Sequence, residues 1–178
     1  MTNNTPSIPE MTIGIDLGNK EHELCILNRA GVIIKRDQVL NNVIEVKEYF
    51  GKINNPTKVK IAMEAGTCSP WMSDLLKTIG FKVIVANPRK LRMIWSSKNK
   101  NDARDAEMIA RVARFDPELL YGIQHRSMNA QQMLTVIKVR DHFVRSRTKT
   151  INSLRGVLKS LGITELPKCD ADSFSEKI

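Results

Sequence analysis

The sequence predicts an α/β fold, in which a mixed β-sheet with flanking helices is followed by one long helix of coiled-coil type. Three observations predict it. Between residues 11 and 39, three short β-rich segments are joined by tight turns, as in an antiparallel meander. Between residues 42 and 86, helical and β-rich segments alternate, which is typical of parallel strands with crossover helices. Between residues 129 and 161 there is no proline, and apolar residues recur every seven positions.

The first half of the chain gives seven elements in order. Strands are expected over 11–17, 21–28 and 32–39, and apolar residues at helical spacing predict a helix over 42–53. The alternating segment KVKIAME then predicts a strand over 58–64. The remaining two elements are a helix with Ser69 as its N-cap and Pro70 at its first position, and a strand over 81–86. The order β-β-β-α-β-α-β fits a ribonuclease-H-like layout, and equally one lobe of an actin-like ATPase, which shares that core topology.

The second half is expected to be helical. Residues 102–115 predict a helix that Pro117 ends. In the long helix, one seam of the heptad pattern is apolar throughout, and a second seam is interrupted in the middle by Arg140 and Arg147. The first seam consists of Ala130, Ile137, Val144, Ile151 and Leu158. The pattern predicts a coiled coil, with a long helix packed against its own domain as the alternative.

These elements divide the chain into four expected segments. They are a disordered tail at 1–10, a ribonuclease-H-like domain at 11–120, a dimerising helix at 127–161, and a tail or the start of a further domain at 162–178.

Composition narrows the function classes. No apolar run reaches the roughly 18 residues that a membrane span needs, and the polar N-terminus is unlike a signal peptide, so a cytoplasmic protein without membrane contact is expected. The net charge of +9 is concentrated in residues 88–160, which hold 16 Lys/Arg against 6 Asp/Glu. Such a concentration favours binding to the phosphate backbone of a nucleic acid, although a solvated basic helix face would look the same.

Four carboxylates are the candidate catalytic and metal-binding residues. Asp16 ends the first strand and Glu64 ends the fourth, so both are expected at the carboxyl edge of the sheet, where ligands bind. Asp102 and Asp105 are three residues apart and therefore share a face of their helix. Four converging carboxylates are the oxygen ligands that Mg²⁺ or Mn²⁺ prefers, and such ions can stabilise a phosphodiester displacement. Taken singly, the same residues also suit helix caps and turns.

Four motifs, taken in order, resemble the N-terminal half of transposases of the insertion-sequence-110 family, which includes Piv-type DNA invertases. The motifs are GIDLG (Gly14–Gly18), EAGTCSPW (Glu64–Trp71), VIVANPRKLR (Val83–Arg92) and KNDARDA (Lys100–Ala106). The resemblance covers roughly residues 11–160. It implies a RuvC-like domain with an Asp-Glu-Asp-Asp tetrad, which falls on the same four carboxylates.

The resemblance also implies a function. Members of the family recombine DNA at specific sites with Mg²⁺ and a structured guide (bridge) RNA, and a long helical region mediates their association into dimers or higher oligomers. Members continue into a second domain that carries a serine nucleophile, so this chain is expected to lack that domain and to be inactive alone. Action on donor and target DNA implies a place in the bacterial cytoplasm, at the nucleoid.

A basic stretch around the third and fourth motifs is the candidate nucleic-acid contact. Its cations are Arg89, Lys90, Arg92, Lys98, Lys100 and Arg104. Lysine and arginine with an interleaved aromatic residue, here Trp95, suit contact with an RNA backbone and base stacking.

Three other functions stay open at this point. An actin-like ATPase lobe would use an Asp-x-Gly segment after the first strand, but the chain has no Gly-Gly pair and no second Asp-x-Gly segment. The chain also lacks a GxxxxGK phosphate loop, which excludes ordinary P-loop ATPases. A non-catalytic nucleic-acid-binding dimer would keep the RuvC-like fold as a scaffold, and its binding would survive neutralisation of Asp16 or Glu64. A Holliday-junction resolvase would use a similar tetrad, and the second and fourth motifs favour the transposase.

Overall fold

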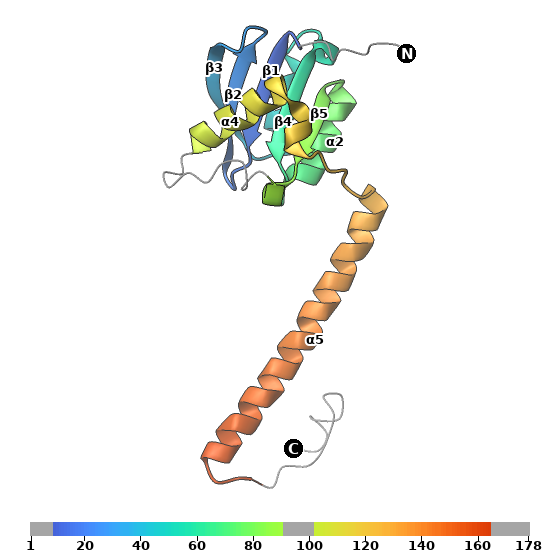
Figure 1. The fold of residues 1–178 in the computed structure, drawn as a ribbon. Helices are drawn as coiled ribbons and strands as arrows, with labels where there is room; N and C mark the ends of the chain where they lie inside the picture. The colour runs from blue at the N-terminus through green and yellow to red at the C-terminus, as the bar shows by residue number, and fades with distance from the viewer. Residues whose placement is uncertain (1–8, 91–101, 165–178) are drawn as a thin grey trace, which may run out of the picture. The chain divides into compact units, whose positions relative to one another are not determined.

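The computed structural model describes residues 9–90 and 102–164, with the side chain of Asp102 outside the described part. The chain forms two units, which divide between His125 and Arg126. The first unit is built on a five-stranded sheet of order β3-β2-β1-β4-β5, and the second contains one long helix (Figure 1).

The sheet is mixed, as the sequence predicts. Strand β1 (Met11–Asp16) pairs antiparallel with β2 (Glu21–Asn28), which pairs antiparallel with β3 (Ile33–Leu40). On its other side, β1 pairs parallel with β4 (Val59–Glu64), which pairs parallel with β5 (Lys82–Ala86). The meander followed by helix-linked parallel strands confirms the ribonuclease-H-like layout.

Helices cover both faces of the sheet. Helices α1 (Val43–Gly51) and α2 (Ser69–Ile79) pack on one face, over a core that includes Ile13, Ile61 and Phe50. Helix α4 (Asp102–Phe115) crosses the other face over β1, β2 and β4 (Figure 1). Short 3₁₀ turns, η1 (Pro56–Lys58) and η2 (Pro117–Leu120), complete the unit.

Helix α4 lies unusually close to β1 because the sequence places small residues where the two elements meet. A Cβ atom added at Gly14 would lie 2.1 Å from the carbonyl oxygen of Ala106 and 2.6 Å from the amide nitrogen of Ala110. Only glycine fits that contact. The GIDLG motif therefore sets the depth at which α4 packs over the sheet.

One detail of the predicted caps is wrong. Ser69 is the first residue of α2 rather than its N-cap, which is Cys68, and no side-chain hydrogen bond caps the helix. The Ser69 hydroxyl instead donates to the Gly66 carbonyl at 2.7 Å and accepts from the Gly66 amide at 3.0 Å. This local loop competes for the hydroxyl that a cap would use.

The second unit contains α5 (Met128–Ser160), which begins at an N-cap hydrogen bond from the Ala130 amide to Ser127. Several large apolar side chains along α5 are exposed, among them Met133, Ile137 and Phe143. Neither α5 nor any other helix within residues 9–90 and 102–164 combines the length and apolar character needed to cross a membrane.

Candidate functional site

The first two candidate carboxylates end neighbouring parallel strands. Ile15 of β1 pairs with Met63 of β4, so Asp16 and Glu64, the next residue in each strand, lie side by side. Side chains alternate along a strand, and Ile15 and Met63 face the core under α1 and α2. Asp16 and Glu64 therefore lie on the face that α4 covers, and both are half-buried.

Helix α4 brings the third carboxylate over the same face. Ala106 and Ala110 pack at Gly14, two residues before Asp16, and the half-buried Asp105 directly precedes Ala106. Asp102 begins the helix and its side chain lies outside the described residues. The two strand ends and the first turn of α4 thus belong to one face of the sheet.

The described side chains do not by themselves form a complete metal-binding site. Within residues 9–90 and 103–164, no three His, Cys, Asp or Glu side chains lie close enough together to hold a metal ion. The structure therefore sets Asp16 and Glu64 at adjacent strand ends and Asp105 on the covering helix, but these three side chains do not form one ligand group.

A fifth carboxylate, which the sequence reasoning missed, lies in the same row. Glu23 of β2 is directly opposite Asp16 in the antiparallel register, so Glu23, Asp16 and Glu64 stand on three adjacent strands. The Glu23 carboxylate accepts a hydrogen bond from the Gln38 side chain on β3. Cys25 and Leu27 of β2 pack under Ala106 of α4. Because side chains alternate along a strand, Glu23 faces the same way, and this alternation is the signal that could have identified it.

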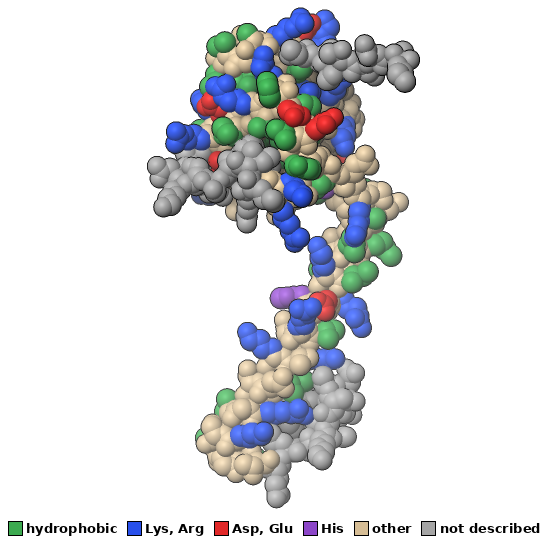
Figure 2. Space-filling model, in the orientation of Figure 1, with side chains coloured by type: hydrophobic (Ala, Val, Ile, Leu, Met, Phe, Trp, Pro, Cys, Tyr) green, Lys and Arg blue, Asp and Glu red, His purple; other side chains and the backbone are tan. Residues whose placement is uncertain are grey.

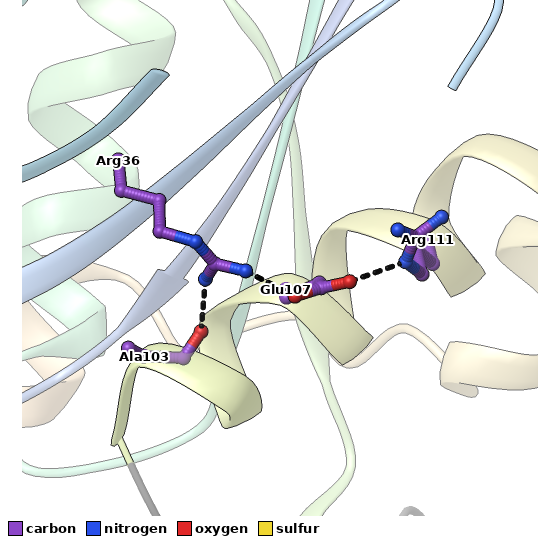
Figure 3. A network of polar contacts seen from close by, with 4 residues as sticks. All are labelled: Arg36, Ala103, Glu107 and Arg111. Carbon is purple, nitrogen blue, oxygen red and sulfur yellow. Dashed lines mark hydrogen bonds and ion pairs between the residues drawn. The ribbon is translucent and has the colours of Figure 1, made fainter. Parts of the chain in front are cut away.

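An arginine from the edge strand fixes the first turns of α4 (Figure 3). The Arg36 guanidinium donates to the Ala103 carbonyl at 2.9 Å and also binds the Glu107 carboxylate. Glu107 accepts a second hydrogen bond, at 2.7 Å, from Arg111 one turn later. Arg111, and then Arg36, hold the pKa of Glu107 below its ordinary value.

The loop after Glu64 is tied to the segment that ends the first unit. His125 Nε2 lies within hydrogen-bond distance of Ser69 Oγ, at 3.0 Å. The tautomer of the imidazole decides which of the two atoms donates. Burial lowers the pKa of His125, and the nearby Asp74 carboxylate partly opposes that shift.

The predicted nucleic-acid residues are only partly within the described chain. Arg92, Lys98 and Lys100 lie outside it. Arg89, Lys90 and Arg104 are described and exposed, and the Lys90 ammonium lies 5.4 Å from the centre of the Tyr121 ring. These three side chains are open to solvent and accessible to an anionic ligand.

Positive charge continues along α5. The helix carries seven Lys/Arg and a single acid, Asp141, which pairs with Arg145 at 2.9 Å. Figure 2 shows blue side chains along most of this helix. Most of the positive charge of α5 is therefore open to solvent.

The chain is similar to known transposases over most of its length. A family model described as "Transposase" for the Asp-Glu-Asp-Asp group of IS110 matches residues 13–163. The transposase of insertion sequence IS1111A from Coxiella burnetii is 28% identical over 158 residues, covering 85% of this chain and 40% of that protein. The transposase of IS1328 from Yersinia enterocolitica is 28% identical over 158 residues, covering 88% and 45%. The chain thus spans less than half the length of these relatives.

Among solved structures, Thermus thermophilus RuvC in complex with a Holliday-junction substrate covers 61% of this chain and 95% of its own, with 14% identity and a TM-score of 0.41. The fold assignment rests on the strand order and register of this chain rather than on that score. The family match extends from β1 through α5 and includes both strand-end carboxylates and α4. The chain belongs to the DEDD transposase family of IS110-type insertion sequences.

Proposed function

We propose that Asp16, Glu64, Asp102 and Asp105 hold Mg²⁺ or Mn²⁺, and that this site takes part in cleaving and transferring DNA strands. The observation that supports the proposal most directly is the pairing of β1 with β4, which sets Asp16 beside Glu64 under α4. Carboxylates on adjacent strand ends disfavour each other's charge, and a divalent cation bound to both would relieve that repulsion.

The donor set fits a hard divalent cation. All four side chains offer carboxylate oxygens, the ligands that Mg²⁺ and Mn²⁺ prefer over nitrogen or sulfur. A divalent cation bound there would stabilise the charge on the attacking and leaving oxygens of a phosphodiester. The part played by the chain would be positioning, since Asp16 and Glu64 end β1 and β4 and Asp105 lies in the first turn of α4.

The proposed partners are donor and target DNA and a structured guide RNA. Family membership and the exposed cations Arg89, Lys90 and Arg104 support this part of the proposal. Self-association as a dimer or higher oligomer through residues 127–161 is proposed from the apolar seam of α5, of which Ile137 and Val144 are exposed. Such a role would place the protein at the bacterial nucleoid.

A second candidate function is a nucleic-acid-binding dimer with a non-catalytic RuvC-like scaffold. The observation that favours it is that Asp16, Glu64 and Asp105 do not form a three-residue metal group among the side chains described. The two functions differ in one respect that can be measured. Metal binding should depend on Asp16 and Glu64 in the first, and nucleic-acid binding should be indifferent to both in the second.

The test is a calorimetric titration of the chain with Mn²⁺ in the presence of a DNA duplex. Asp16→Asn and Glu64→Gln are compared with Glu48→Gln, which removes an exposed carboxylate from α1 on the opposite face. The proposal predicts saturable binding that is lost in the first two variants and kept in the third. Equal Mn²⁺ affinity in all four proteins, with DNA binding retained, would favour the scaffold.

A further inference from the structure

A pocket of about 300 Å³ opens at the amino ends of β4 and β5, away from the strand ends that carry Asp16 and Glu64. Four cations line it, namely Arg29 from the β2–β3 turn, Lys58 from η1, Lys60 from β4 and Lys82 from β5. Within the described residues, Glu10 is the one acid in the lining, and its carboxylate pairs with Lys58 at 2.8 Å. The pocket therefore has a strong excess of positive charge.

Two of these cations lie next to each other on neighbouring strands of the sheet. Lys60 and Lys82 are directly paired in the parallel register of β4 and β5, so their side chains leave the same face of neighbouring strands. Like charges in that position destabilise a sheet. Burial, and next the charge of Lys82, lower the pKa of Lys60.

Helix α4 holds Lys60 in place. The Lys60 ammonium donates to the carbonyl oxygen of Ala113 at 3.2 Å, in the last turn of α4. A cation is favourable near a helix C-terminus, and this contact fixes the half-buried Lys60 side chain at the pocket. The fold thus keeps a cluster of cations whose mutual repulsion an anion would relieve.

We infer that this pocket binds a phosphate of a nucleic-acid backbone, at a second contact separate from the carboxylate site. The inference rests on the proposed function for the identity of the anion, because a transposase must hold a polyanion. Lysine and arginine side chains contact phosphates without reading base sequence, so the contact serves to position the strand rather than to select it.

The two sites engage different phosphates. Lys60 and Glu64 are on the same face of β4 and four residues apart, which corresponds to about 13 Å along a strand. A single phosphate cannot reach both ends of that distance. The pocket therefore holds a separate part of the nucleic acid while the carboxylates engage the reacting part.

The test measures how the affinity for nucleic acid depends on salt. Fluorescence anisotropy with a DNA duplex and an RNA hairpin is recorded between 50 and 300 mM KCl for the chain, for Lys82→Gln and for Lys47→Gln. Both lysines are exposed, and Lys47 lies on α1, on the other face of the sheet. Lys60→Met is a second pocket variant, and inorganic phosphate is titrated as the competing small anion.

Loss of one phosphate contact should lower the affinity of Lys82→Gln about five- to tenfold at 100 mM salt and reduce the slope of log K against log salt by about one. Lys60→Met should weaken binding similarly and unfold at the same or a higher temperature, because it removes a repelled charge. Lys47→Gln should match the parent chain.

Unchanged affinity and slope in Lys82→Gln and Lys60→Met would overturn the inference while leaving the carboxylate proposal intact, provided that Mn²⁺ binding still depends on Asp16. Saturable binding of inorganic phosphate that these variants abolish, with nucleic-acid affinity unaltered, would assign the pocket to free phosphate and also overturn it. Failure of the parent chain to bind either oligonucleotide would contradict both this inference and the proposed function.

Discussion

At the scale of single residues, the site depends on the absence of a side chain at Gly14 as well as on the carboxylates. Gly14 allows the backbone of α4 to lie against β1, and an added Cβ would meet the Ala106 carbonyl oxygen at 2.1 Å. We expect Gly14→Ala to lower the free energy of unfolding of the first unit by about 3 kcal/mol, since a backbone atom cannot yield as a side chain can. Urea denaturation measures this.

The matched control for that variant is Gly51→Ala at the end of α1. A Cβ at Gly51 would meet nothing within 4 Å, and its backbone does not require glycine. Gly51→Ala should leave stability unchanged or slightly raised. Equal stability of the two variants would show that α4 does not pack on β1 as described.

Arg36 acts on the site through α4. It binds both the Ala103 carbonyl and Glu107, so it joins β3 to the helix that carries Asp102 and Asp105. Arg36→Gln should cost about 1 kcal/mol of stability, because its guanidinium is partly exposed. It should weaken Mn²⁺ binding about three- to tenfold, since the first turn of α4 loses its link to the sheet.

Arg111→Gln is the control for Arg36→Gln. It also removes an ion pair with Glu107, but that pair lies within α4 and does not reach the sheet. Its Mn²⁺ affinity should stay at the parent value in the same calorimetric titration. A similar loss of affinity in both variants would point to the charge of Glu107, rather than the position of α4, as the cause.

At the scale of elements, two histidines that the fold partly or wholly removes from solvent, His125 and His22, make the stability of the first unit depend on pH. Burial lowers the pKa of His125 and of His22 below the ordinary value of 6.5. Below that pH the unfolded chain takes up protons that the folded chain does not, so stability falls as the pH drops from 7 toward 5. Above pH 7 these two histidines should not make the free energy of unfolding depend on pH.

The measurement is urea denaturation at pH 7.5, 6.5 and 5.5 for the parent chain and His125→Gln. The variant should lose less stability on acidification than the parent chain, because one of the two imidazoles with a lowered pKa is gone. His142, which is exposed on α5, supplies the control His142→Gln, for which the pH dependence should be that of the parent. An identical pH dependence in all three would contradict the buried environment of His125.

The long helix α5 carries the proposed self-association. Val144 lies on the apolar seam and Val139 lies off it, while both side chains are substantially exposed. Val144→Glu should convert a dimer into a monomer at tens of micromolar in analytical ultracentrifugation, because a charge would be buried in the seam. Val139→Glu should remain a dimer. Monomeric parent protein, or equal effects of the two changes, would contradict the coiled-coil interpretation.

At the scale of the whole molecule, the sequence predicted the parts of the fold that depend on local patterns. Alternation in KVKIAME placed β4, and the spacing of Ala106, Ile109 and Ala110 placed α4 with its buried face. The position of Asp16 and Glu64 at neighbouring strand ends follows from the rule that parallel strands end at one edge of a sheet. The family resemblance is confirmed by the match over residues 13–163.

Contacts between distant residues could not be predicted in the same way. Arg36 and Glu107 are 71 positions apart, and Ser69 and His125 are 56 apart. Each pair depends on how α2 or α4 is seated on the sheet, which no local pattern records. The N-cap prediction at Ser69 failed for a related reason, because the hydroxyl found closer partners in Gly66.

We propose above that the ends of β1 and β4 and the start of α4 form one cation site. Iron-mediated cleavage of the chain tests it directly, since Fe²⁺ takes oxygen ligands and, with added ascorbate and hydrogen peroxide, generates hydroxyl radicals that cut the nearest backbone. With DNA bound, we predict cuts close to Asp16, Glu64 and Asp102 that excess Mg²⁺ suppresses and Asp16→Asn abolishes. Cuts confined to other segments, or an unchanged pattern in Asp16→Asn, would contradict the claim.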